Sequence, residues 1–229
     1  MKTAPEPESR DAFKAQFLAV VSHELRTPLT SIAAFTEMLS GVDLPEGERP
    51  TALSVVQRNT ERMLVLVEDL MLLSRLESGD LPVQSEPVAL APVVAGAGQE
   101  VERVVPTAAV RGTVEAGPPV RGDASLLHQL FYAVTGAMTE RALDGSGEIQ
   151  GACFGDHWTI TVRSTQAETL TDEYFLATSL PVPGDGRTRS LALWMLLARA
   201  IAHRHGGAVS ISFAPETGAA ITVRLPAAA

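Results

Sequence analysis

Two long stretches of regularly spaced apolar residues constrain the fold of this chain more than any other feature of its sequence. In residues 9–40 and 48–76, apolar side chains recur three and four positions apart, which is the spacing of one helix face. Gly, Asp and Pro in residues 41–47 predict a loop between two helices, and Ser9 is a suitable N-cap for the first. The expected seam of the first helix consists of Leu18, Val21, Leu25, Leu29, Ile32, Phe35 and Leu39. One antiparallel hairpin would leave this seam open, and a second copy would bury it in a four-helix bundle.

The sequence pattern changes after residues 79–87, a stretch with Gly, Asp, Ser and Pro that predicts a linker. Beyond it we expect helices over residues 91–105, 125–143 and 191–205, and strands over 108–114, 148–154, 157–163, 209–213 and 220–225. Helices and strands in this order predict an α+β sandwich of helices over a mixed sheet. The expected organisation is therefore a flexible leader (1–8), a hairpin domain (9–78), the linker (79–87) and a second domain (88–226).

Composition excludes several classes of protein. The net charge of −9 argues against a surface for nucleic acid or anionic membranes. A lone Cys153 rules out an intramolecular disulfide and suits a reducing compartment. No apolar stretch reaches the roughly 18 residues of a membrane span. We therefore expect a cytoplasmic protein with no membrane span and no nucleic-acid partner.

His23 is the residue in the first helix whose surroundings suggest chemistry. At 100° per residue, its side chain lies about 200° around the helix from Val21, away from the apolar seam. Glu24 lies on the flank, and Thr27 shares the face of His23 one turn on. Imidazole is a nitrogen nucleophile, and an adjacent carboxylate can take a proton from one ring nitrogen while the other attacks phosphorus. Pro28 removes a backbone donor, so we expect a bend near His23.

Several motifs resemble those of sensor histidine kinases, and together they span nearly the whole chain. Residues 17–30, which contain Ser-His-Glu-Leu-Arg-Thr-Pro, resemble the phosphoacceptor box of that family. Residues 68–79 resemble the end of its second hairpin helix. Gly122-Asp123 resembles the start of its ATP-binding helix, and His205-Gly206-Gly207 resembles the end of its ATP-binding domain.

The resemblance implies a role for each residue of the phosphoacceptor box. His23 is then the phosphorylated residue, Glu24 the acid/base, and Thr27 the residue that positions water for phosphatase activity. Arg26 and Pro28 are structural members of the box. The resemblance further implies that the hairpin forms a homodimer, docks the receiver domain of a response regulator, and can accept phosphate from an upstream kinase.

The second domain departs from the family where the nucleotide should bind. The family places Mg²⁺-binding asparagines on the helix after Gly-Asp, but here those positions hold Ala133 and Ala137, and the only asparagine of the chain is Asn59. Glu140 is the nearest carboxylate, which is a side chain that can bind Mg²⁺. We therefore expect no metal site, with Glu140 as the one weak candidate.

The adenine-binding and lid motifs of the family are also altered. No glycine occurs between Gly155 and Gly184, where the family has Asp-x-Gly-x-Gly, and Glu168 and Asp172 are displaced from the aspartate position. Gly184 and Gly186 are candidate remnants of the phosphate-binding lid. Ser190 and Ala192 replace lid glycines, and these losses together should remove most of the nucleotide affinity.

Three hypotheses remain open on the sequence alone. The favoured one is a histidine-kinase-like dimer with a degenerate ATP domain, which transfers phosphate through His23 or acts as a phosphatase, and binds no cofactor. The second is an active kinase with an unusual site for ATP and Mg²⁺. The third is an interaction scaffold without catalysis.

Overall fold

The computed structural model describes residues 7–41, 45, 47–80, 85–165, 179–181, 188–214 and 218–228. The chain divides into two compact units, residues 1–70 and 71–229. This division falls inside the second helix, whereas we expected it in the linker at 79–87, of which residues 81–84 lie outside the described residues. The domain boundaries therefore stay a prediction.

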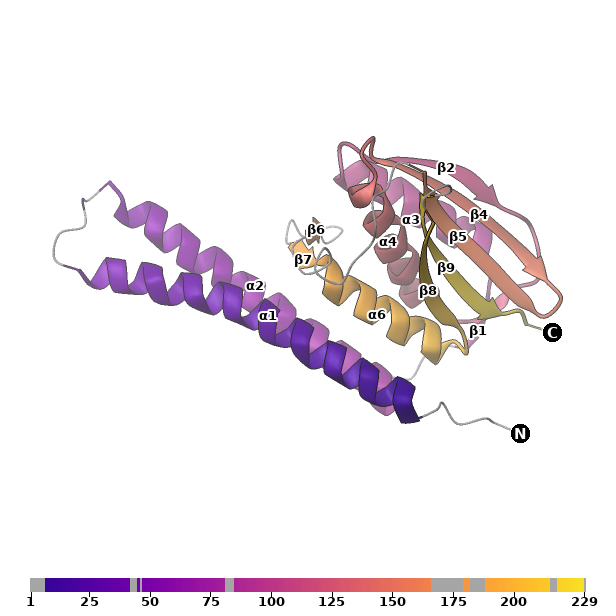
Figure 1. The fold of residues 1–229 in the computed structure, drawn as a ribbon, viewed down its shortest axis with the longest axis horizontal. Coiled ribbons are helices and arrows are strands. Elements are labelled where there is room, and N and C mark those ends of the chain that lie inside the picture. Colours follow the sequence, from indigo (N-terminus) through magenta and orange to yellow (C-terminus); the bar gives the residue numbers. More distant parts are fainter. Residues whose placement is uncertain are drawn as a thin grey trace. The chain divides into compact units, whose positions relative to one another are not determined.

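Two long helices form an antiparallel hairpin (Figure 1). Helix α1 spans Pro7–Ser40 and helix α2 spans Arg49–Ser78. The start predicted at Ser9 was wrong by two residues, because proline suits the first helical position; Pro7 and Glu8, expected in the leader, are helical. Leader residues 1–6 lie outside the described residues. Pro28 lies inside α1, and the helix continues through it.

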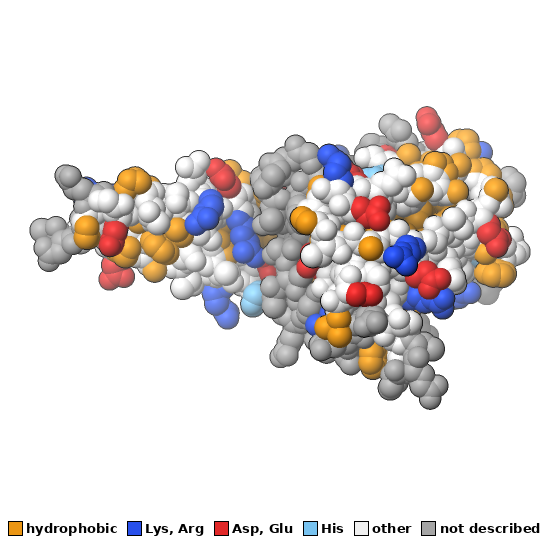
Figure 2. All heavy atoms as spheres, turned by 90° about the horizontal axis from the view of Figure 1, so that it is seen from above, with side chains coloured by type: hydrophobic (Ala, Val, Ile, Leu, Met, Phe, Trp, Pro, Cys, Tyr) orange, Lys and Arg blue, Asp and Glu red, His pale blue; other side chains and the backbone are white. Residues whose placement is uncertain are grey.

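The hairpin buries one set of side chains and leaves a second apolar set exposed. Val20 of α1 and Ala52, Val65 and Leu66 of α2 are buried. Leu18 and Leu29 of the expected seam are 61% and 49% exposed. The exposed large apolar side chains of the two helices are Leu18, Leu29, Met38, Leu53, Leu64, Val67 and Met71. Figure 2 shows hydrophobic side chains at the surface along the hairpin, so a single copy leaves apolar area in water.

A five-stranded sheet organises the second unit. Its strands are β2 (Ala109–Val114), β4 (Ser146–Phe154), β5 (His157–Ser164), β8 (Ala208–Ala214) and β9 (Gly218–Pro226). Their order is β2-β4-β5-β9-β8, with β2 parallel to β4 and the other pairs antiparallel. Two antiparallel ribbons flank it, β1 (Glu86–Val88) with β3 (Val120–Gly122) and β6 (Ser179–Pro181) with β7 (Thr188–Ser190).

Helices α3 (Leu90–Val104), α4 (Ala124–Arg141) and α6 (Leu191–Arg204) cover one face of this sheet (Figure 1). Side chains alternate along the strands, so that Trp158, Ile160 and Val162 of β5 are buried against the helices. Helix α4 is buried all round, with every residue from Leu130 to Thr139 buried, as expected for a helix in the middle of a core. The structure confirms the predicted fold class.

The short strands are the main elements that the sequence did not predict. Strands β3, β6 and β7 have three residues each, too few for an alternating pattern to be recognised. Strand β1 has three residues as well and lies at the end of the expected linker. Among the described residues, none of the helices has the combination of length and apolar character that crossing a bilayer requires.

Candidate functional site

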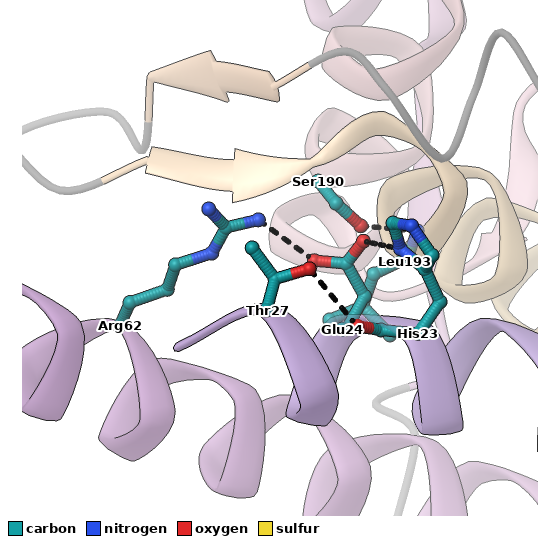
Figure 3. Close-up of polar contacts among 6 residues, drawn as sticks. All are labelled: His23, Glu24, Thr27, Arg62, Ser190 and Leu193. Carbon is teal, nitrogen blue, oxygen red and sulfur yellow. Dashed lines mark hydrogen bonds and ion pairs between the residues drawn. The ribbon is translucent and has the colours of Figure 1, made fainter. Parts of the chain in front are cut away.

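His23 presents its imidazole on α1 with one ring nitrogen engaged (Figure 3). Its side chain is 47% exposed, and Nδ1 lies 3.4 Å from Oε1 of Glu24. This pairing turns the Nδ1 edge toward the carboxylate, so Nε2 is the ring nitrogen left to react. The arrangement fits a nucleophile whose proton is held on the opposite side of the ring.

Glu24 is a buried carboxylate held between two partners. Its side chain is only 4% exposed, and Oε2 accepts a hydrogen bond of 3.0 Å from Nη2 of Arg62 on α2 (Figure 3). The sequence placed Glu24 on the flank of the helix without indicating its burial, which arises because α2 packs over that side of α1. Burying a carboxylate costs free energy unless it is paired and hydrogen-bonded, and Arg62 supplies a cation and a hydrogen bond.

Arg62 is the site residue that the sequence reasoning missed, although a signal was present. Residues 41–48 join the two helices, so positions opposite Glu24 lie about as far beyond this loop as Glu24 lies before it. Arg58 and Arg62 are the basic residues of that stretch. Had Glu24 been recognised as buried, its need for a cation would have pointed to these two.

Thr27 lies one turn beyond His23 on the same side of α1 (Figure 3). Its hydroxyl Oγ1 donates a hydrogen bond of 3.3 Å to the backbone oxygen of His23. Arg26 is exposed and Pro28 is buried in the uninterrupted helix. The hydroxyl is therefore next to the imidazole, in water, and held by a long and weak hydrogen bond.

In the second unit, Gly122-Asp123 and His205-Gly206-Gly207 are far apart in the sequence and come together at one junction. The Oδ1 atom of Asp123 caps α4 by accepting from the backbone N–H groups of Ser125 (2.9 Å) and Leu126 (3.1 Å). The Nε2 atom of His205 accepts from the N–H of Asp123 (3.1 Å), and Nδ1 donates to the oxygen of Ile201 (2.7 Å). Burial lowers the pKa of His205, although its bond to Ile201 and the charge of Asp123 oppose that shift. The neutral imidazole thus links the ends of α4 and α6.

Glycines are required around this junction for steric reasons. A Cβ atom at position 122 would lie 2.2 Å from Cδ2 of His205. A Cβ atom at position 207 would lie 2.0 Å from the backbone oxygen of Arg224. The role of Gly122-Asp123 and His205-Gly206-Gly207 in this structure is therefore to hold the ends of α4 and α6 together.

The middle of α4 carries no polar side chain at the two positions where the resemblance calls for asparagine. Ala133 and Ala137 are both fully buried. The rings of Tyr132 on α4 and Trp194 on α6 pack with centroids 5.2 Å apart and planes inclined at 53°. These two helices thus meet through an aromatic contact, with both side chains almost entirely buried.

The remaining candidates from the sequence are partly outside the described residues. Glu140 ends the buried stretch of α4, and burial raises the pKa of its carboxyl. Gly184 and Gly186 lie outside the described residues, as do Glu168 and Asp172. Ser190 serves as the N-cap of α6, since its Oγ accepts from the N–H of Leu193 at 3.2 Å (Figure 3). Among the described residues, no three His, Cys, Asp or Glu side chains gather in a group that could hold a metal ion.

Comparison with known proteins agrees with this arrangement. Residues 13–79 match the family model for the His Kinase A (phospho-acceptor) domain. Over 226 residues the chain is 30% identical to the phosphate regulon sensor protein PhoR of Pseudomonas aeruginosa, which covers 93% of this chain and 50% of that protein. The chain thus spans about half the length of this curated relative.

Solved structures show the same fold. The Acinetobacter baumannii histidine kinase AdeS aligns over 90% of this chain and 98% of its own, with a TM-score of 0.67 and 19% identity. The ATP binding domain of PrrB from Mycobacterium tuberculosis aligns over 63% of this chain and 98% of its own, with a TM-score of 0.50 and 16% identity. The chain thus carries a hairpin that matches the His Kinase A (phospho-acceptor) domain, followed by a helix-covered mixed sheet, and this is the architecture of a histidine kinase transmitter core.

Proposed function

We propose that this chain transfers phosphate between His23 and the aspartate of a response-regulator receiver domain, without drawing that phosphate from ATP bound to its own second unit. The observation that carries the proposal is a contrast within one chain. The hairpin keeps a half-exposed imidazole beside a buried, cation-paired carboxylate. The helix that should ligate Mg²⁺ presents buried alanines instead.

The chemistry at His23 needs only groups that the hairpin supplies. The Nε2 lone pair of His23 forms a bond to the phosphorus of an aspartyl phosphate. The phosphorus–oxygen bond breaks, and its electron pair returns to the receiver carboxylate. The ring becomes positively charged in this step, and the carboxylate of Glu24 at Nδ1 stabilises that charge. Arg62 holds the carboxylate of Glu24 in place, so we assign it a positioning role.

The described residues of the second unit do not fit Mg-ATP. Ala133 and Ala137 offer no ligand atom for a metal, and both side chains are enclosed by protein. The aromatic contact between Tyr132 and Trp194 closes α4 against α6. Glu140 is a single carboxylate, and its raised pKa reflects surroundings that disfavour its charged form. The second unit therefore does not supply His23 with phosphate from ATP.

We further propose that two copies pair through their hairpins. The support is the set of large apolar side chains left exposed on α1 and α2, which a four-helix bundle would bury. Thr27 is placed to orient a water toward phosphate on His23 or on a docked receiver, which would give phosphatase activity. The receiver domain is the partner that this chemistry requires.

A phosphotransfer assay with two arms tests the proposal. The full chain is mixed with receiver domains carrying labelled aspartyl phosphate, in one arm without nucleotide and in the other with labelled Mg-ATP and unphosphorylated receivers. We expect acid-labile label on the chain only in the first arm, and none in a His23→Gln variant. Label from Mg-ATP on His23 would instead establish an active kinase. Absence of label in both arms, from a folded dimer, would contradict phosphotransfer.

A further inference from the structure

The two edges of the five-stranded sheet are treated very differently. Strand β2 forms one edge and β8 the other (Figure 1). At β2, the backbone N–H of Val110 donates to Oε1 of Glu102 on α3 at 2.9 Å, so a side chain occupies the edge. Gly112 has a φ of 101°, which interrupts the regular strand, and Arg111 adds a charge. These are ordinary means by which proteins prevent strand addition.

Strand β8 has none of these protections. Its sequence over Ala208–Ala214 contains no charged residue, proline or glycine. All seven residues pair with β9 in unbroken register, from Ala208 opposite Arg224 to Ala214 opposite Gly218. Among the described strands, none pairs with its outer edge. The apolar side chain of Phe213 is 42% exposed, and Val209 and Ile211 are half-buried.

The hydrogen-bonding pattern identifies which backbone groups face outward from β8. The N–H of Ala227 donates to the oxygen of Asp156, so odd-numbered residues of β9 bond to β5. The even-numbered residues of β9 therefore bond to β8, and their partners there are Ala208, Ser210, Ser212 and Ala214. The N–H and C=O groups of Val209, Ile211 and Phe213 consequently point away from the sheet. We call the outward backbone groups and side chains of these three residues the β8 edge.

We propose that the β8 edge pairs with the β8 edge of a second copy, as antiparallel strands related by a two-fold axis at Ile211. In this register Ile211 lies opposite Ile211 of the other copy, and Val209 lies opposite Phe213. Every outward-facing residue meets an outward-facing residue, so all their N–H and C=O groups are satisfied. The axis also places an aromatic side chain against a β-branched one on each side, which is a favourable cross-strand pair.

Because β8 carries no charge, two copies of this strand can pair without repulsion between side chains. Two copies of a strand with a charged residue near the two-fold axis would bring like charges together. Here the residues nearest the axis on the outer face are Ser210 and Ser212, both exposed. Pairing would give a continuous sheet through two second units. This association uses a different surface from the hairpin and does not depend on the chemistry of His23.

Two charge variants at the same positions test the proposal. In the two-fold register, Ser210 lies opposite Ser212 of the other copy in a non-hydrogen-bonded pair, where side chains are closest. S210E/S212E therefore brings glutamates together, whereas S210E/S212K brings opposite charges together. We expect sedimentation velocity of the full chain to show association through β8 weakened about tenfold in the first variant, and restored to within about threefold of the parent in the second.

Hydrogen–deuterium exchange of the unmodified chain provides a readout that needs no variant. The outward amides of Val209, Ile211 and Phe213 should exchange more slowly as protein concentration rises, in the parent and in S210E/S212K but not in S210E/S212E. Equal self-association in all three proteins would overturn the proposal. So would slow exchange of these three amides at every concentration, because the edge would then be covered by the chain itself. Failure of hairpin pairing or of phosphotransfer would leave these expectations unchanged.

Discussion

The hairpin and the second unit differ in the polar groups that they bury. The hairpin retains polar groups that cost free energy to bury, namely the carboxylate of Glu24 and its partner Arg62. The second unit retains its capping, its glycine-dependent junction and its apolar core, yet the centre of α4 contains no amide, carboxylate or cationic side chain, and alanines occupy positions 133 and 137. The second unit thus has the family's fold although α4 lacks the asparagines that the resemblance calls for, since packing and capping are satisfied by other residues.

Restoring a polar side chain to α4 should have the largest effect on stability. In Ala137→Asn, an amide larger than the methyl group enters a fully enclosed site. We expect a loss of about 3 kcal/mol or more in the free energy of unfolding, measured with urea. Ala124→Asn, at the exposed start of α4, is the control and should be nearly neutral. If the variant were as stable as the parent and bound Mg-ATP tightly, the second unit would still have room for a nucleotide site, which would contradict the contrast with the hairpin.

Removing Arg62, the partner of the buried Glu24, tests how much this ion pair contributes to the stability of the hairpin. Arg62→Ala leaves Glu24 buried without its cation, so we expect a loss of about 2 kcal/mol, reduced from the value for a fully buried pair because Arg62 is partly exposed. Phosphotransfer through His23 should slow more than receiver binding weakens, since Arg62 acts through Glu24. The matched control is Arg58→Ala, an exposed arginine one turn earlier. If Arg58→Ala and Arg62→Ala changed stability and phosphotransfer equally, the positioning role of Arg62 would be contradicted.

Acid should weaken the second unit through His205. Burial lowers the pKa of this imidazole in the folded state, so the unfolded chain binds a proton first as pH falls. Stability is therefore complete above the ordinary histidine pKa and decreases as pH falls from about 6.5 toward the lowered value. In His205→Gln, unfolding free energies measured from pH 7 to pH 5 should fall less steeply. His203→Gln, on the exposed side of α6, should keep the parent slope.

The smallest expected effect lies at Glu140. Burial raises the pKa of this carboxyl, so its ionised form disfavours folding, and that cost appears as pH rises through the unfolded value. Glu140→Gln should stabilise the chain at pH 7 by about 0.5 kcal/mol, as measured by thermal unfolding. If Glu140→Gln were less stable than the parent, the carboxylate of Glu140 would have an attractive partner. The second unit would then contain a paired carboxylate, as the hairpin does at Glu24.

Local patterns predicted most of this molecule, and long-range pairings account for what they missed. Helical spacing predicted the two helices of the hairpin, and strand patterns predicted the five strands of the central sheet. The burial of Glu24 could not be read from a helical wheel, because it depends on how α2 packs over α1. The contact of Arg62 with Glu24 spans 38 residues and the bond of His205 to Asp123 spans 82. Both required the folded arrangement of helices.

The position of β9 has a consequence for synthesis. Its residues are the last of the described strands to leave the ribosome, yet β9 lies inside the sheet, between β5 and β8. Until residues 218–226 emerge, β5 has one unpaired edge and β8 has no neighbour at all. The hairpin, by contrast, is complete within the first 78 residues. Nascent chains should therefore display a finished phosphoacceptor while the rest is still exposed to chaperones, and a premature stop would remove an interior strand.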